Sequence, residues 1–128
     1  MEILASRMLL RPSDYPRSLA FYRDALGLAI AREYPGGTVF FAGQSLIELA
    51  GHGGPADHPG VFPGALWLQV RDIRATEDEL LARGVTVTRP ARQEPWGLIE
   101  MHVTDPDGTT LIFVEVPAGH PLRRDGRS

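Results

Sequence analysis

The sequence predicts an α+β fold of two βαβββ modules that form a concave mixed sheet. The same order of apolar segments, helical stretches and turns occurs twice, with Asp14 and Asp72 58 positions apart and Gly27 and Gly84 57 apart. Residues 51–64, with five glycines and three prolines, are typical of a connector between the two copies. We expect a single domain of 128 residues, with modules at about 1–50 and 65–117.

In the first module, residues 3–10 are predicted to form a strand that ends at Arg11, because a residue before proline avoids helical geometry. A helix then begins at Ser13 or Asp14, either of which can cap it, and Pro16 suits its first turn. Gly27 ends it, since glycine tolerates positive φ. The helix buries a stripe of apolar residues at helical spacing: Leu19, Phe21, Tyr22 and Leu26.

Alternating apolar residues and Gly or Pro turns predict three strands after this helix, at residues 28–34, 38–42 and 45–50. The second module repeats the pattern with strands at 65–70, 85–88, 98–103 and 110–116 and a helix at 73–83. We expect an irregular segment at 90–95, a tight turn at 105–108 and a frayed polar tail at 118–128.

Composition excludes several classes of function. There is no cysteine, and all 13 basic residues are arginine, so thiolate and lysine chemistry are both excluded. The formal charge of −3 and the scattered arginines argue against a nucleic-acid partner. Residues 1–10 are too short and too polar for a signal peptide or a membrane span. We expect a cytoplasmic protein with no membrane partner.

Two motifs carry a family resemblance. Residues 14–28 read DYPRSLAFYRDALGL, and residues 95–108 run from Pro95-Trp96-Gly97 through Glu100-Met101 to a DPDG turn. With these motifs, the chain resembles the vicinal oxygen chelate superfamily (glyoxalase, bleomycin resistance protein and extradiol dioxygenase) from about residue 7 to residue 115. It looks closest to the bleomycin resistance-like, metal-free binding branch. The resemblance implies a sheet of eight strands, usually completed in a homodimer.

The resemblance also implies where enzymes of this superfamily hold a divalent metal, with ligands on the first and last strand of each module. The matching positions here are Arg7, Glu48, Ala65 and Ile112, or Phe113 after a slip of one residue. Of these side chains, only the Glu48 carboxylate can donate to a metal. We therefore expect no metal and no other cofactor. We also expect Arg7 and Glu48 to form an ion pair, because metal-bearing relatives bring these two positions together.

Strand alternation predicts which side chains line the concave face. Val39 and Phe41 should share a face with Glu48, Trp67 and Gln69 should share one with Ala65, and Met101 should lie opposite Ile112. The alternative interpretation, in which Phe41, Trp67 and Met101 are core residues, stays open, and Phe62 and Trp96 fit either interpretation. The predicted ligand-binding set is Arg7, Val39, Phe41, Glu48, Phe62, Trp67, Gln69, Trp96, Met101 and Ile112.

Other polar residues have simpler explanations. His52, His58 and His120 lie in the connector or the tail, and His102 stands alone on a strand, so we expect solvated or structural histidines. The acidic run at 77–79 is typical of a solvated helix face. Asp105 and Asp107 suit turn chemistry.

Three functions remain possible from the sequence. The leading hypothesis is a protein that binds a small aromatic, antibiotic or natural-product molecule in a cleft of a homodimer and confers resistance by sequestration. The alternative is a lyase, an isomerase or another enzyme of the same fold that uses Glu48 without the usual metal ligands. A module that serves only protein interactions is the third possibility, and an exposed apolar patch away from the cleft would favour it.

Overall fold

The computed structural model describes residues 1–51 and 62–122. Most of the predicted connector, including His52 and His58, lies outside the described residues. The chain divides into two compact units. The first comprises Met1–Pro63 together with the turn Asp105–Gly108, and the second comprises Gly64–Thr104 and Thr109–Ser128.

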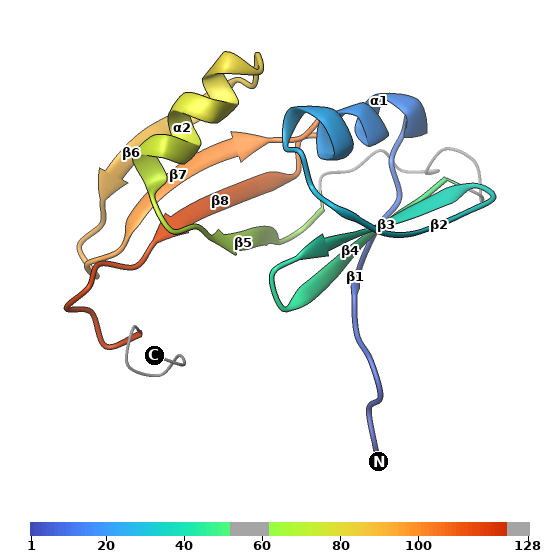
Figure 1. Ribbon diagram of the computed structural model, residues 1–128, viewed down its shortest axis with the longest axis horizontal. Coiled ribbons are helices and arrows are strands. Elements are labelled where there is room, and N and C mark those ends of the chain that lie inside the picture. Colours follow the sequence, from blue (N-terminus) through green and yellow to red (C-terminus); the bar gives the residue numbers. More distant parts are fainter. Residues whose placement is uncertain (52–61, 123–128) are drawn as a thin grey trace. The chain divides into compact units, whose positions relative to one another are not determined.

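The first unit contains a four-stranded mixed sheet in the order β1-β4-β3-β2 (Figure 1). Its strands are β1 (Met8–Leu10), β2 (Ile30–Tyr34), β3 (Gly37–Ala42) and β4 (Ser45–Ala50). β1 pairs with β4 in parallel, and the other neighbours are antiparallel. A short helix, α1 (Tyr15–Ala20), continues into a π-helical segment, η1 (Phe21–Ala25). Of the two expected caps, Asp14 is the one that caps α1: its carboxylate accepts from the Arg17 amide at 3.2 Å. Gly27, expected to end the helix, has a φ of 70°.

The core of the first unit lies between the helical segment and one face of the sheet. Tyr22, Phe40 and Leu49 are almost fully buried. The Tyr22 ring stands edge-on to Phe21, with 5.1 Å between the ring centroids. The Tyr22 hydroxyl donates to the Asp105 carboxylate at 2.7 Å, which satisfies a polar group that would otherwise be buried without a partner.

The second unit repeats this design with a mixed sheet in the order β5-β8-β7-β6. Its strands are β5 (Ala65–Gln69), β6 (Val87–Gln93), β7 (Ile99–Thr104) and β8 (Thr110–Glu115), and its helix is α2 (Ile73–Ala82). The Asp72 carboxylate caps α2 by accepting from the amides of Arg74 and Ala75. Helix α2 covers one face of this sheet (Figure 1), and Ile73 and Leu80 are buried beneath it. The predicted α+β class with two βαβββ modules is confirmed.

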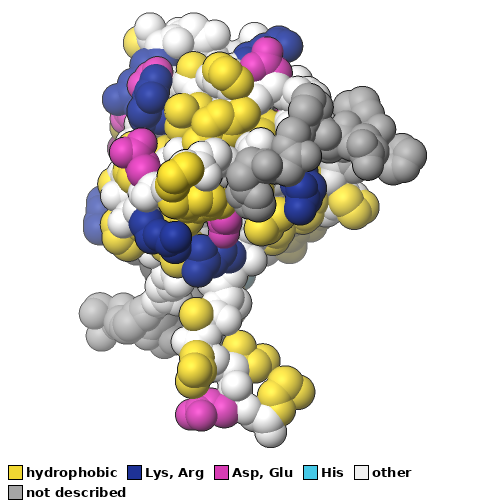
Figure 2. Space-filling model, turned by 90° about the vertical axis from the view of Figure 1, so that its right-hand side faces the viewer, with side chains coloured by type: hydrophobic (Ala, Val, Ile, Leu, Met, Phe, Trp, Pro, Cys, Tyr) yellow, Lys and Arg dark blue, Asp and Glu magenta, His cyan; other side chains and the backbone are white. Residues whose placement is uncertain are grey.

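Two predicted strand boundaries were wrong. The first strand begins at Met8 rather than at residue 3, and the segment before it extends away from β1 with exposed apolar side chains (Figures 1 and 2). β6 runs through Pro90, where an irregular segment was expected. It is an edge strand whose register shifts on both sides of Arg89, so a residue without an N–H group is tolerated there.

The predicted pairing of β7 with β8 was wrong by one residue. Met101 pairs with Phe113 and faces α2 with no exposed surface, whereas His102 lies opposite Ile112. The five residues 105–109 separate the paired residues Thr104 and Thr110, one more than the expected turn contains. A slip of one residue moves every side chain of a strand to the other face. Met101 is therefore a core residue of its unit, and the prediction that it lines a ligand site is wrong.

No helix among residues 1–51 and 62–122 is long and apolar enough to cross a bilayer.

Candidate functional site

The first polar group lies on the face of the β1–β4 sheet that points away from the helical segment. Arg7 Nη1 lies 3.1 Å from Glu48 Oε1, and the Tyr34 hydroxyl donates to Glu48 Oε2. Register explains this convergence, since Glu48 pairs with Leu9 of β1 and with Val39 of β3. Arg7 lies two residues before Leu9, so it shares this face. The predicted ion pair between Arg7 and Glu48 is confirmed.

Tyr34 was missed by the sequence reasoning. It lies on β2 opposite Gly37, and a Cβ atom at position 37 would lie only 2.1 Å from the Tyr34 ring. The missing side chain of Gly37 therefore lets the phenol lie across the sheet toward Glu48. The hydrogen bond to Glu48, reinforced by burial, raises the pKa of the Tyr34 hydroxyl, which keeps it a donor at neutral pH. The Arg32 guanidinium lies 5.0 Å from the centroid of the same ring.

Apolar side chains surround this polar group. Val39, which pairs with Glu48, is 2% exposed, whereas Phe41 on the same face is 53% exposed and Leu9 is 46% exposed. The predicted shared face of Val39, Phe41 and Glu48 is confirmed. An exposed aromatic ring beside a buried, paired carboxylate is an arrangement that can contact an apolar molecule.

The residues at the four expected ligand positions do not fit a divalent metal. Arg7 carries a permanent positive charge, and its guanidinium occupies one oxygen of Glu48. Ala65 and Ile112 have no donor atom. Across residues 1–51 and 62–122, no three His, Cys, Asp or Glu side chains lie close enough together to hold a metal ion. The donor set therefore disagrees with the metal that the family resemblance implies.

In the second unit, the sheet face opposite α2 carries Trp67, Gln69 and Ile112. Trp67 pairs with Ile112 across β5 and β8 and is 48% exposed. Gln69 is also exposed. Ile112 is half-buried and packs against a small apolar cluster of Leu98, Val114 and Val116. Trp67 is thus a surface residue of its unit, as the ligand-binding interpretation requires.

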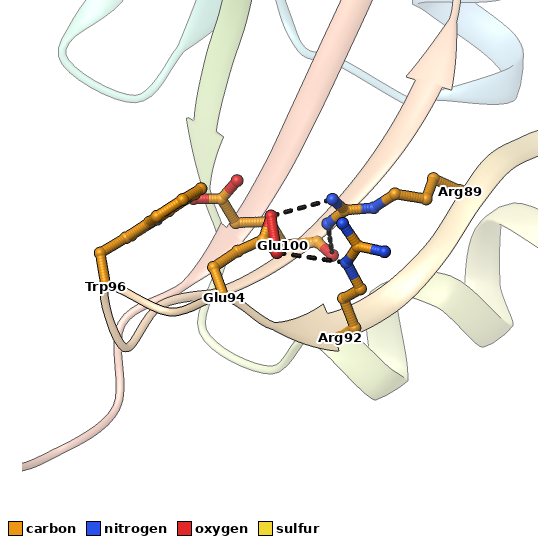
Figure 3. Close-up of polar contacts among 5 residues, drawn as sticks. All are labelled: Arg89, Arg92, Glu94, Trp96 and Glu100. Carbon is orange, nitrogen blue, oxygen red and sulfur yellow. Dashed lines mark hydrogen bonds and ion pairs between the residues drawn. The ribbon is translucent and has the colours of Figure 1, made fainter.

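A charged cluster lies at the β6 and β7 edge of this unit (Figure 3). Glu94, which is 7% exposed, accepts from Arg89 Nη1 at 2.9 Å and from Arg92 Nε at 3.2 Å. These two arginines lower the pKa of Glu94, which keeps it ionised. Arg89 Nη2 also donates to the backbone oxygen of Glu100 at 2.8 Å. Glu94 therefore orders both guanidinium groups along one strand.

Trp96 and Glu100 form the other part of the cluster. Trp96 Nε1 donates to Glu100 Oε2 at 2.8 Å, and the indole is 57% exposed whereas Glu100 is 7% exposed. A tight turn holds Trp96, with the Gly97 amide bonded to the Glu94 oxygen at 2.8 Å and a Gly97 φ of 96°. Sequence reasoning identified Trp96 but missed Glu100. The sequence feature that could have identified Glu100 is its position four residues after Trp96, just beyond the Pro-Trp-Gly turn.

The remaining predicted residues are placed as follows. Phe62 is half-buried in the segment before β5. His102 is half-buried on the face opposite α2, where it pairs with Arg89, and burial together with that arginine lowers its pKa. His120 contacts the backbone oxygen of Trp96 at 3.0 Å. The tail therefore engages the Trp96 turn, which was not expected of a frayed segment.

Two βαβββ units, each with a mixed sheet of this strand order, define a glyoxalase-like protein. The sequence matches the Glyoxalase/Bleomycin resistance protein/Dioxygenase superfamily over residues 5–113, and the chain belongs to this superfamily. It is 35% identical to the lactoylglutathione lyase of Haemophilus influenzae, over 90% of this chain and 93% of that protein. It is also 29% identical to the uncharacterized protein YraH of Bacillus subtilis, over 84% of this chain and 92% of that protein.

Solved structures agree on the fold. A glyoxalase/bleomycin resistance protein/dioxygenase from Nocardioides aligns with a TM-score of 0.72 at 20% identity, over 100% of this chain and 91% of that one. A glyoxalase/bleomycin resistance protein from Catenulispora acidiphila aligns with a TM-score of 0.70 at 23% identity, over 90% of this chain and 100% of that one.

Proposed function

We propose that this protein binds small aromatic molecules without a metal, as the bleomycin resistance branch of its superfamily does, and protects against an antibiotic or natural product by sequestering it. One observation carries the proposal. The one metal-donor carboxylate of the expected quartet, Glu48, is bound to a guanidinium and a phenol. A carboxylate held in this way is a poor metal ligand, because a metal would have to displace a permanent cation.

Exposed aromatic residues support binding. Phe41, Trp67 and Trp96 are each about half exposed, which is unusual for large aromatic side chains. Aromatic surfaces with a few fixed polar groups are what small-molecule sites use. The exposed Leu9 and Phe41 also favour a homodimer, which sedimentation at micromolar concentration would test.

A second candidate function is lactoylglutathione lyase or a related reaction. The similarity to the Haemophilus influenzae enzyme over most of both chains favours it. The donor set opposes it, since Arg7, Ala65 and Ile112 stand at three of the four metal positions. A metal-free version of this function would assign Glu48 as the base.

The two functions can be distinguished with purified protein. The protein is incubated with nickel or zinc, freed of excess ion, and assayed for lactoylglutathione lyase activity beside the Haemophilus influenzae enzyme as positive control. In parallel, a panel of aromatic compounds is screened by quenching of Trp67 and Trp96 fluorescence, and bound compounds are recovered for mass measurement. We expect no turnover, no retained metal and unchanged masses. Turnover that Glu48→Gln abolishes would instead establish the enzyme.

A further inference from the structure

We propose that Arg32 forms a subsite for a carboxylate group of the guest, on the face of the β1–β4 sheet that points away from the helical segment. We call this the open face of the first unit, and the argument uses five of its residues: Arg32, Tyr34, Val39, Phe41 and Glu48. The proposal rests on the binding function proposed above. It specifies the class of guest, which is an apolar molecule that bears a carboxylate.

A β-bulge places Arg32 on the open face. Ile30 pairs with Phe40, whose ring packs near Tyr22 on the side of the helical segment. An unbroken ladder from this pair would turn Arg32 toward the same side. The register instead shifts between Ile30 and Arg32, so that Arg32 pairs with Val39. A shift of one residue moves a side chain to the other face of a sheet, and bulges re-aim side chains in this way.

The positive charge of Arg32 has no counterion within the described part of the chain. Arg7 is paired with Glu48, and the other oxygen of that carboxylate accepts from the Tyr34 hydroxyl. Glu33, the next residue of β2, lies on the opposite face of the sheet. No described carboxylate forms an ion pair with the Arg32 guanidinium. The open face therefore carries two guanidinium groups and one carboxylate, and this excess of positive charge suits an anionic guest.

The Tyr34 ring holds the Arg32 guanidinium in place. The central carbon of the guanidinium lies 5.0 Å from the ring centroid, within the range of a cation–π contact. This contact uses none of the N–H donors of the guanidinium, and two parallel N–H groups match the two oxygens of a carboxylate. A side chain that is already held against a ring loses less conformational entropy when it binds a guest.

Phe41 provides the apolar contact for the body of the guest. It lies two residues after Val39 on β3, so it shares the open face with Arg32, and it is 53% exposed. Diagonal neighbours on two antiparallel strands are about 7–8 Å apart. A guest of the size of an aryl acetate can therefore contact the Phe41 ring while its carboxylate reaches Arg32.

The test uses three compounds of similar shape: 1-naphthylacetate, 1-naphthylacetamide and 2-(1-naphthyl)ethylamine. Affinities are measured by calorimetry, and the site is identified by the Arg32 Nε–H signal in NMR spectra, assigned with Arg32→Gln. We expect the acetate to bind about tenfold more tightly than the neutral amide, and the amine to bind most weakly. The Arg32 signal should move with the acetate, and a signal that does not move would overturn the proposal.

Variants decide whether Arg32 is responsible. Arg32→Gln should remove the preference for the acetate and leave the affinity for the amide within about twofold, because the variant loses the charged donor pair. Arg17→Gln, at an exposed position of α1 in the same unit, is the matched control and should keep the preference. A preference that survives in folded Arg32→Gln, or that both variants lose equally, would overturn the assignment. If Arg32→Gln does not fold, the response of the Arg32 signal in the unchanged protein decides.

The two proposals fail differently. Absence of binding by all three compounds and by the wider aromatic panel would contradict the proposed binding function and the carboxylate subsite with it. Binding without any preference for the acetate would leave that function standing and would refute the carboxylate subsite alone.

Discussion

Arg7 Nη1 and Glu48 Oε1 lie 3.1 Å apart, at two positions that the family resemblance assigns to ligands of one metal ion. The Glu48 side chain is 11% exposed and the Arg7 side chain 37% exposed, so the pair is neither fully buried nor a loose surface contact. Tyr34 occupies the second carboxylate oxygen. A permanent cation and a neutral donor therefore hold the two oxygens of the Glu48 carboxylate.

Glu48→Gln should lower the free energy of unfolding by about 1–2 kcal/mol, because Arg7 loses its charged partner while keeping partial solvation. Chemical denaturation measures the change. Glu33→Gln, at an exposed position of β2, is the matched control and should change stability by less than about 0.5 kcal/mol. Equal effects of the two variants would mean that the ion pair contributes nothing.

The pairing of Tyr34 with Glu48 predicts a loss of stability at alkaline pH. The pKa of Tyr34 is raised in the folded state, mainly by this hydrogen bond. The folded protein therefore holds the phenolic proton more tightly than the unfolded chain, and stability falls as pH rises above about 10. Below that pH, the hydrogen bond between Tyr34 and Glu48 contributes its full stabilisation.

Tyr34→Phe should reduce this alkaline loss, as measured by unfolding at pH 9, 10 and 11. Part of the loss will persist, because burial and Asp105 raise the pKa of Tyr22 as well. A pH profile identical to that of the unchanged protein would refute the role of Tyr34.

The lowered pKa of His102 predicts a loss of stability at acidic pH. Its pKa is lowered in the folded state by burial and by Arg89, so the unfolded chain binds the proton more tightly. The stability that the neutral His102 imidazole contributes is present above the pKa of the unfolded chain, about 6.5, and is lost as the pH falls through the pKa of the folded protein. NMR titration should place the His102 midpoint below that of a histidine in the unfolded chain. A midpoint at or above the unfolded value would contradict the burial of this imidazole.

The sequence predicted the order of the fold, the Arg7–Glu48 ion pair and the sheet face that carries it. The βαβββ order, a cap at Ser13 or Asp14 and the shared face of Val39 and Glu48 follow from local patterns and a short hairpin. Met101 was assigned to the wrong sheet face because the turn between β7 and β8 contains one residue more than expected, and a shift of one residue moves every side chain to the other face. No local sequence pattern indicates that extra residue.

The missed partners depend on distant elements. Tyr34 reaches Glu48 only because Gly37 leaves space on the neighbouring strand. Glu100 lies beside Trp96 because β6 and β7 pair antiparallel, with Arg92 opposite Glu100, and Trp96 lies in the segment that joins the two strands. Predicting a side-chain network of this kind requires the register of two paired strands. The register shifts on both sides of Arg89 cannot be read from the sequence.

The backbone conformation of Gly97 predicts that a side chain at this position would destabilise the Trp96 turn. Its φ of 96° is strained for any other residue, and a Cβ atom would lie 3.1 Å from His120 Cδ2. Gly97→Ala should therefore lower the free energy of unfolding by about 1–2 kcal/mol and shift the Trp96 fluorescence, measured in a Trp67→Phe background. Gly119→Ala is the matched control: its Cβ would meet open space, and its backbone is not among the positive-φ positions.

Truncation after Pro117 should also shift the Trp96 signal, because it removes the His120 contact with the Trp96 oxygen. A truncated chain whose Trp96 emission matches that of the full protein would mean that the turn is held by its own hydrogen bonds alone.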